Sequence, residues 1–172
     1  AQSVSDMVQF MYSGQIGLDA NNVLKVLRVA DQFLVEPLKQ KCFNFLYSEI
    51  SVLNACEVLT ASIEQEEFEV TESILSFICE NFEAVAAVGS LDRVAPEIML
   101  ELVARDELSV SCESVVFEVV ERWARADEPA RLASTNVVTE ALALIRFPFM
   151  PPDFLSTTVA QSPLLAAVPE LG

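Results

Sequence analysis

The side chains best suited to nucleophilic or metal chemistry in this 172-residue sequence are four cysteines, at positions 42, 56, 79 and 112. Their separations are far too wide for a Cys-x-x-Cys pair, the spacing typical of zinc and redox sites. Each cysteine lies in an apolar pattern with helical spacing, where a free thiol behaves as a small hydrophobic side chain. We therefore predict reduced, buried cysteines that hold no metal.

Histidine is absent from the chain. Its absence removes Ser-His-Asp and Cys-His catalysis, histidine-liganded zinc and the commonest general base. The aspartates and glutamates show no pairing at a catalytic spacing, and no glycine-rich phosphate loop or nucleophile elbow is present. The sequence thus predicts a protein that is not an enzyme and has no cofactor.

Acidic residues dominate the charge: 26 Asp and Glu stand against 10 Lys and Arg, for a net charge of −16. Such a surface repels phosphate backbones, so we expect no nucleic-acid partner. The densest acidic run, EQEEFE at 64–69, is interpreted as a solvated helix end or loop. No apolar run approaches the roughly 18 residues that cross a bilayer, and no signal peptide is visible. We expect an intracellular protein, cytoplasmic or nuclear, without a membrane partner; since the first residue is not Met, the sequence resembles a piece of a longer chain.

The apolar residues recur mostly at spacings of three and four, and only 4 glycines occur, so the expected fold class is mainly all-α. One short strand is expected around Ile16–Leu18, after a turn at Ser13-Gly14. Asn54 and Glu57 have the spacing of a capping box at a helix start. About ten helices in antiparallel pairs are expected. The first long helix should bury one face, formed by Val23, Leu27, Ala30 and Leu34.

The segment FMYSGQI, residues 10–16, resembles the Phe-(Ile/Met)-Tyr-(Thr/Ser)-Gly segment of BTB (POZ) domains, where a helix ends and a short edge strand follows. Tyr12 and Gly14 carry this match. The next stretch, residues 23–46, is similar to the two helices that close a BTB domain. The resemblance implies that residues 1–50 are the C-terminal part of a BTB domain whose first half is missing.

From Ser51 onward the sequence resembles the BACK domain that follows BTB in many adaptor proteins. The family's motifs are an Asn-Phe pair after a helix, a Leu-x-Val-x-x-Glu segment, a Val-Phe-x-x-Val-x-x-Trp helix and an Arg-Phe-Pro turn. The motif positions singled out in this chain are Phe82, Glu113, Trp123, Arg146, Phe147 and Pro148. The resemblance implies an α-helical BACK domain over residues 51–172.

What the resemblance implies for function is a substrate adaptor of a cullin-RING E3 ubiquitin ligase. In that family the BTB part binds the cullin scaffold, and the BACK part positions a domain, here outside the chain, that binds the protein substrate. A homodimer is implied for the full-length protein. A different class stays open: a BTB-BACK scaffold or dimerisation module in transcription or cytoskeletal organisation, with no ligase attached.

Two groups of residues match regions through which such adaptors contact the cullin. Val4 and Asp6 lie where the family often has a hydrophobic-x-Glu element, although Asp is one methylene shorter. Asp6 could instead simply favour a helix N-terminus. The second group, in the first BACK helices, is Leu53, Val58 and Leu59. At helical spacing, such apolar residues are more often part of the core than of a contact surface.

The segment RFPFMPP, residues 146–152, contains three prolines and predicts a rigid corner, with Phe147 and Phe149 directed to opposite neighbours. Arg146 could bind helix-end carbonyls, an acidic residue such as Glu113, or a partner. Phe117 and Trp123 lie six residues apart on one predicted helix, so each should contact a different neighbour.

All three lysines lie in the BTB-like part: Lys25, Lys39 and Lys41. Every later basic residue is arginine, which stays protonated and cannot act as an acceptor in ubiquitin transfer. If the protein presents substrates to a ligase, self-modification within this chain should map to these lysines. An arginine-leaning composition would produce the same distribution without any functional cause.

Overall fold

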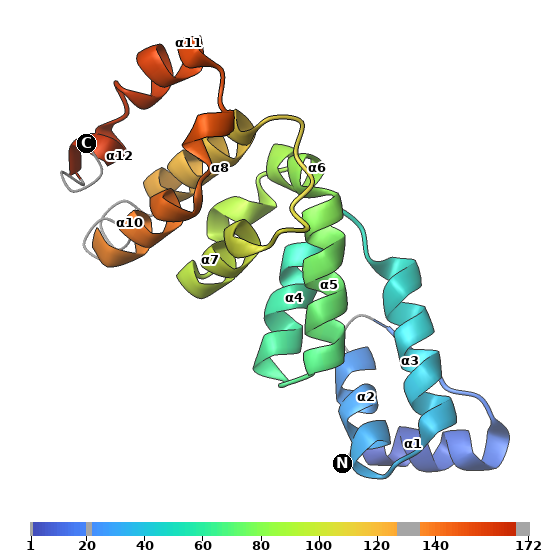
Figure 1. The fold of residues 1–172 in the computed structure, drawn as a ribbon. Coiled ribbons are helices and arrows are strands. Elements are labelled where there is room, and N and C mark those ends of the chain that lie inside the picture. The colour runs from blue at the N-terminus through green and yellow to red at the C-terminus, as the bar shows by residue number, and fades with distance from the viewer. Residues whose placement is uncertain (1, 20–21, 127–134, 168–172) are drawn as a thin grey trace. The chain divides into compact units, whose positions relative to one another are not determined.

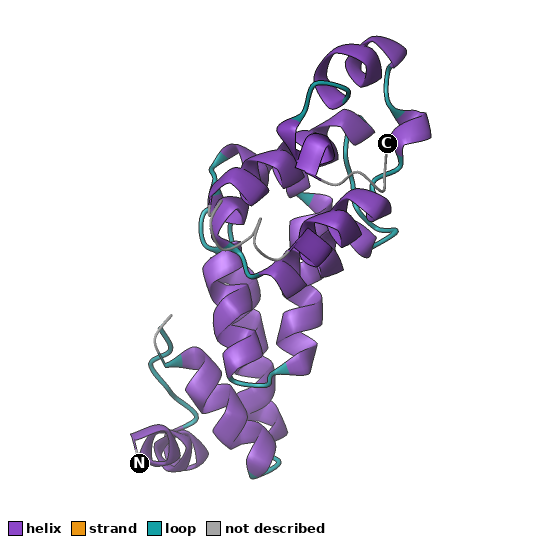
Figure 2. Cartoon of the chain, turned by 90° about the vertical axis from the view of Figure 1, so that its left-hand side faces the viewer, coloured by secondary structure: helices purple, strands orange, loops and turns teal. Residues whose placement is uncertain are grey.

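The computed structural model describes residues 2–19, 22–126 and 135–167. Every regular element in these residues is a helix, and none of them forms a strand (Figure 2). The mainly all-α fold class is confirmed. The helices in chain order are α1 (Gln2–Ser13), α2 (Val23–Gln32), α3 (Glu36–Glu49), α4 (Ala55–Glu64), α5 (Phe68–Glu80), α6 (Phe82–Ala87), η1 (Ser90–Arg93), α7 (Pro96–Ala104), α8 (Glu113–Ala126), α10 (Thr135–Leu144), η2 (Phe147–Phe149), α11 (Pro152–Phe154), η3 (Leu155–Val159) and α12 (Pro163–Ala167).

Packing divides the chain into two compact units, Ala1–Leu75 and Ser76–Gly172, with the division inside α5. In the first unit α2 packs against both α1 and α3 (Figure 1). The buried face of α2 consists of Val23, Leu24, Val26, Leu27 and Ala30. The buried residues of helix α3 are Leu38, Cys42 and Leu46, which are spaced four apart and therefore share one face. Each buried leucine contributes roughly 1.5–3 kcal/mol, so burial at this interface stabilises the unit.

The short strand expected around Ile16–Leu18 is not present. Residues 15–19 are neither helical nor paired, because a strand needs a neighbouring extended segment and the described residues offer none. The turn before it does form as expected. Gly14 adopts a positive φ of 67° and its N–H donates to the Phe10 carbonyl at 2.7 Å, ending α1.

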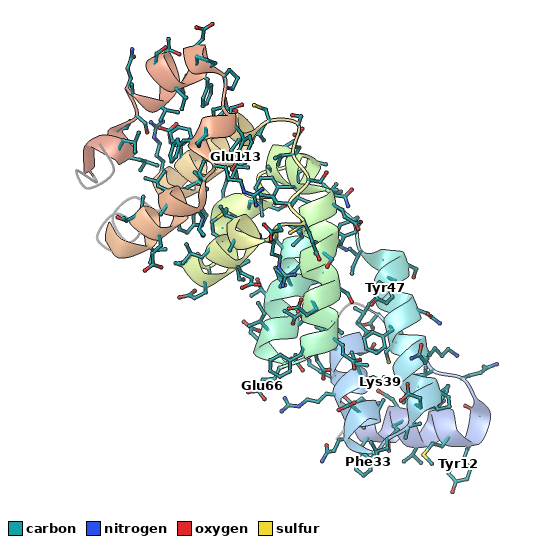
Figure 3. All side chains as sticks on the ribbon, viewed as in Figure 1. Tyr12, Phe33, Lys39, Tyr47, Glu66 and Glu113 are labelled. Carbon is teal, nitrogen blue, oxygen red and sulfur yellow. The ribbon has the colours of Figure 1, made fainter. Side chains whose placement is uncertain are left out.

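Polar contacts join α3 to α5 within the first unit. The Lys39 ammonium pairs with the Asp31 carboxylate at 2.9 Å and with that of Glu69 at 3.3 Å. About two turns further along α3, and one turn further along α5, the hydroxyls of Tyr47 and Ser73 are hydrogen-bonded at 2.7 Å. Lys39 and Tyr47 lie along the same helix in Figure 3. These contacts fix α3 against the start of α5.

In the second unit the core is built on α8. Its Trp123 indole N–H donates to the Val94 carbonyl at 3.0 Å. Phe117 instead makes edge-to-face contacts with Phe147 and Phe154, at centroid distances of 6.3 and 6.0 Å. The expectation that these two aromatic residues contact different neighbours is confirmed, and α8 thereby ties the unit's early helices to its last ones.

Candidate protein-interaction site

A groove of about 330 Å³ opens in the first unit between the start of α2, the end of α3 and α4. Its lining is mainly apolar. The lining residues are Val23, Leu24, Phe45, Leu46, Glu49, Ile50, Asn54, Glu57, Val58 and Ala61. The carboxylates in this lining come from Glu49 and Glu57, and no lining residue is basic. The groove therefore suits an apolar side chain that has a cation beside it.

The linker between α3 and α4 is held by Asn54. Its side-chain oxygen accepts the Ser51 N–H at 2.8 Å and the Ser51 hydroxyl at 3.1 Å, while its Nδ2 donates to the Glu49 carbonyl at 2.9 Å. The capping-box expectation was wrong, since the Asn54 side chain makes no cap hydrogen bond to α4. It closes the preceding turn instead, because the Ser51 and Glu49 backbone groups lie within its reach. That turn sets the angle at which α4 leaves α3 and so shapes the groove.

The three predicted contact residues of the first BACK helices have different environments. Leu53 is 70% exposed on the linker. Val58 is half-buried and lines the groove. Leu59 is 0% exposed and packs in the core, because at this point of α4 it faces inward. A direct partner contact is thus available to Leu53 and Val58, and Leu59 is corrected to a core residue.

Val4 and Asp6 lie on α1, away from the groove. Val4 is exposed; Asp6 is half-buried and accepts a hydrogen bond from Gln2 Nε2 at 2.9 Å. The far end of α1 meets the early part of α3, where the Lys41 ammonium lies 5.5 Å from the Phe10 ring centroid. The groove is lined by residues at the other end of α3, a helix about 21 Å long by its 14 residues. The structure does not bring the two predicted groups together.

One exposed apolar surface includes Val4 but extends well beyond the predicted contact residues. Val4, Val8 and Met11 occur at i, i+4 and i+7 on the solvent side of α1, and Tyr12 beside them is 90% exposed. The turn after α2 adds two more exposed side chains, Phe33 and Leu34. Figure 3 shows Tyr12 and Phe33 at the same end of the first unit. We call these six residues the α1 face. The i, i+4, i+7 spacing was visible in the sequence, but a helix pattern alone does not say which face is covered.

The motif residues of the second unit act within its fold. Phe82 and Trp123 are fully buried. Glu113, at the start of α8, accepts a hydrogen bond from the backbone N–H of Arg146 at 2.8 Å. The Arg146 guanidinium turns elsewhere and pairs with Asp106 at 2.9 Å, an aspartate whose side chain is 99% exposed. Arg146 thus contacts Glu113 as expected, but through its backbone.

The proline-rich corner forms as a break. Helix α10 ends at Leu144, and a separate 3₁₀ turn covers Phe147–Phe149 around Pro148, because proline donates no backbone hydrogen bond. Phe147 packs on Phe117. Phe149, expected to contact an opposite neighbour, is 75% exposed. That part of the prediction was wrong, since no described residue covers this side of the turn.

The three cysteines of the core have weakly acidic thiols, which makes them poor nucleophiles. Burial, followed by the charge of nearby acids, raises the pKa of Cys42 and of Cys56 to about 11, and burial likewise raises that of Cys79 to about 11. Cys112 is half-buried rather than buried, and hydrogen bonds from Ser114 lower its pKa. Over the described ranges, no group of three or more Cys, Asp or Glu side chains could hold a metal ion. No helix in that part of the chain is long and apolar enough to cross a membrane.

Comparison with known proteins gives two family matches and many relatives. The BTB/POZ domain family matches residues 1–50, and the family described as BACK, BTB And C-terminal Kelch, matches residues 55–160. Kelch-like protein 7 of Homo sapiens is 30% identical over 169 residues, which are 97% of this chain and 28% of that protein. Kelch-like protein 41b of Danio rerio is 30% identical over 170 residues, 98% of this chain and 28% of that protein.

A third relative has a different name. BTB/POZ domain-containing protein 6 of Homo sapiens is 34% identical over 168 residues, 92% of this chain and 30% of that protein. The chain therefore spans less than a third of the length of these curated relatives. Since the BACK match alone covers more than half of its residues and a BTB match precedes it, the chain belongs to the BTB-BACK family.

Proposed function

We propose that this chain is part of a non-catalytic substrate adaptor of a cullin-RING E3 ubiquitin ligase. The observation that carries the proposal is the order of the two family matches, BTB over 1–50 and BACK over 55–160, in a chain related to Kelch-like proteins. We assign residues 1–50 to a BTB part that binds the cullin and residues 51–172 to a BACK part. The BACK part positions a substrate-binding domain outside this chain. The full-length protein is a homodimer that acts in the cytoplasm or nucleus and binds neither nucleic acid nor membrane.

The groove beside α4 is the proposed cullin contact. It offers an apolar floor with Glu49 and Glu57 as its carboxylates, so the complementary cullin element is an apolar side chain next to a Lys or Arg. Leu53 stands exposed on the adjoining linker and Val58 lines the groove. Leu59 supports them from the core. Val4 and Asp6 form a second, separate contact on α1.

The test is binding of the purified chain to a cullin N-terminal domain by calorimetry. Leu53→Asp and Val58→Asp should each weaken binding about tenfold or more, as expected for apolar anchors at an interface centre. Phe149→Asp is the matched control, since Phe149 is as exposed as Leu53 but belongs to the second unit. Circular dichroism checks that the half-buried Val58 variant still folds. A wild-type chain that does not bind, or a control that loses binding equally, contradicts the proposal.

The alternative is a scaffold or dimerisation module in transcription or cytoskeletal organisation, with no ligase attached. The α1 face favours it, because a patch of exposed apolar side chains is typical of a protein-binding surface. Self-association through α1 without cullin binding in the same calorimetric experiment would select this alternative.

A further inference from the structure

The three lysines, which are the chain's only side-chain amines, differ sharply in their surroundings. Lys39 is the most restrained. Its ammonium pairs with both Asp31 and Glu69, lies 5.8 Å from the Phe43 ring centroid, and belongs to a side chain only 19% exposed. The hydrogen bond that its ammonium donates to Asp31, opposed by burial and aided by Glu69, raises the pKa of Lys39. Both the contacts and the retained proton work against attack by this nitrogen, because only the neutral amine is nucleophilic.

Lys41 is exposed but anchored. Its ammonium donates to the Gly14 carbonyl at 3.4 Å and lies 5.5 Å from the centroid of the Phe10 ring. It therefore sits at the C-terminal end of α1, where carbonyl groups and an aromatic face favour a cation. These contacts are weaker than the two ion pairs of Lys39, so Lys41 ranks between the other two lysines.

Lys25 is free. Helix α2 buries the face centred near Val23 and Leu27, and at about 100° per residue Lys25 points roughly 180° away from that centre. Its described neighbours one turn away are Asn22, Arg28 and Val29, none of them acidic. No helical ion pair can therefore form along α2 with these residues. Its exposed ammonium makes no hydrogen bond or ion pair with any residue that the structure describes.

We propose that Lys25 is the acceptor site for acyl transfer on this chain, and specifically for self-modification by ubiquitin. The proposal rests on the ligase function above. The neutral Lys25 amine attacks the carbonyl carbon of the thioester that joins the ubiquitin C-terminus to a carrier-protein cysteine. A C–N bond forms and the C–S bond breaks. The sulfur leaves with the bonding electron pair, the nitrogen loses a proton, and the products are an isopeptide and a free thiol.

The first experiment needs no ligase. The chain is treated with a limiting amount of the N-hydroxysuccinimide ester of acetic acid, and acetylation of each lysine is followed by peptide mass spectrometry. We expect the order Lys25, then Lys41, then Lys39, with Lys39 roughly fivefold slower than Lys25 because two ion pairs must open. In the variant Asp31→Asn with Glu69→Gln, Lys39 should approach the rate of Lys25. Faster acetylation of Lys39 or Lys41 in the wild-type chain overturns the proposal.

The second experiment is a reconstituted ubiquitination reaction that contains the chain, the cullin, a RING protein and a carrier protein loaded with ubiquitin as a thioester. Lys25→Arg should remove the main ubiquitin conjugate of the chain, whereas Lys39→Arg, which keeps the charge, should leave its amount unchanged. Conjugation that persists in Lys25→Arg and maps to another lysine of the chain overturns Lys25 as the acceptor but not the ligase function. The absence of any ubiquitin transfer to a wild-type chain that binds the cullin overturns the acceptor role, whereas a wild-type chain that does not bind the cullin overturns the ligase function on which it rests.

Discussion

Glu113 and Arg146 look like an ion pair in the sequence, but their contact predicts unequal effects on stability. The Glu113 carboxylate accepts the backbone N–H of Arg146 at 2.8 Å. Replacing the Arg146 side chain leaves that N–H in place. Replacing Glu113 with Ala removes the acceptor. We therefore expect Glu113→Ala to destabilise the second unit clearly and Arg146→Ala to have little effect.

The magnitudes follow from the two contacts. A hydrogen bond to a charged group contributes about 1.5 kcal/mol, and a carboxylate in the first turn of α8 adds about 0.5 kcal/mol through the helix dipole. Glu113→Ala should thus lower the free energy of unfolding by about 2 kcal/mol. The Arg146–Asp106 pair joins an exposed arginine to a fully exposed aspartate, so Arg146→Ala should cost less than about 0.5 kcal/mol.

Urea unfolding followed by far-ultraviolet circular dichroism measures both changes, with Glu113→Gln as the control that keeps an acceptor oxygen. The melting temperature of Glu113→Ala should fall by about 4–8 °C, given roughly 2–4 °C per kcal/mol for a chain of this size. The double variant should show a coupling energy below about 0.5 kcal/mol, since the side chains do not interact. Equal costs for the two single variants, or a coupling above about 1 kcal/mol, would refute the reasoning.

The α1 face should drive self-association of the isolated chain: Val8→Glu with Met11→Glu should shift it toward monomer in light scattering, whereas Gln9→Glu on another side of α1 should not. A wild-type chain that is already a monodisperse monomer would contradict this. Burial, then the Asp31 charge, raises the pKa of the Glu67 carboxyl above its ordinary value. The folded state then binds this proton more tightly than the unfolded state, so this group lowers stability as pH rises through the raised pKa. Glu67→Gln should therefore stabilise the chain at neutral pH and flatten that part of its pH profile in urea titrations, and a less stable variant at neutral pH would argue against it. Phe117→Ala should cost about 3–5 kcal/mol because it empties the space between Phe147 and Phe154, whereas Phe149→Ala should be nearly neutral; similar losses for both would show that the corner packs differently.

Local patterns predicted the helices well, because apolar residues that recur every three or four positions are typical of an α-helix. The same logic failed at Leu34, expected to continue the inward face of α2. The helix ends at Gln32, and Leu34 adopts a positive φ of 54° with its side chain exposed. Nothing in the spacing marks that end, since the chain turns there to bring α3 back along α2.

Features that depend on distant segments could not be predicted from spacing. The groove needs α2, α3 and α4 at once, together with the turn that Asn54 closes. The strand at residues 15–19 would need an extended neighbour to pair with. Arg146 was matched to Glu113, but no sequence pattern tells a backbone contact from a side-chain contact. What local reasoning lacks in each case is the relative placement of elements far apart in the chain.

The burial of Trp123 has a practical consequence for spectroscopy. It is the chain's single tryptophan and lies in the second unit, with its indole N–H bonded to Val94, while both tyrosines, Tyr12 and Tyr47, lie in the first. Tryptophan fluorescence, excited at a wavelength that only the indole absorbs, therefore reports on the unit of residues 76–172. Its emission maximum moves to longer wavelength when water reaches the ring. Tyrosine absorbance reports on residues 1–75. The two units carry separate natural chromophores, so the order in which they lose structure can be read from one unlabelled sample.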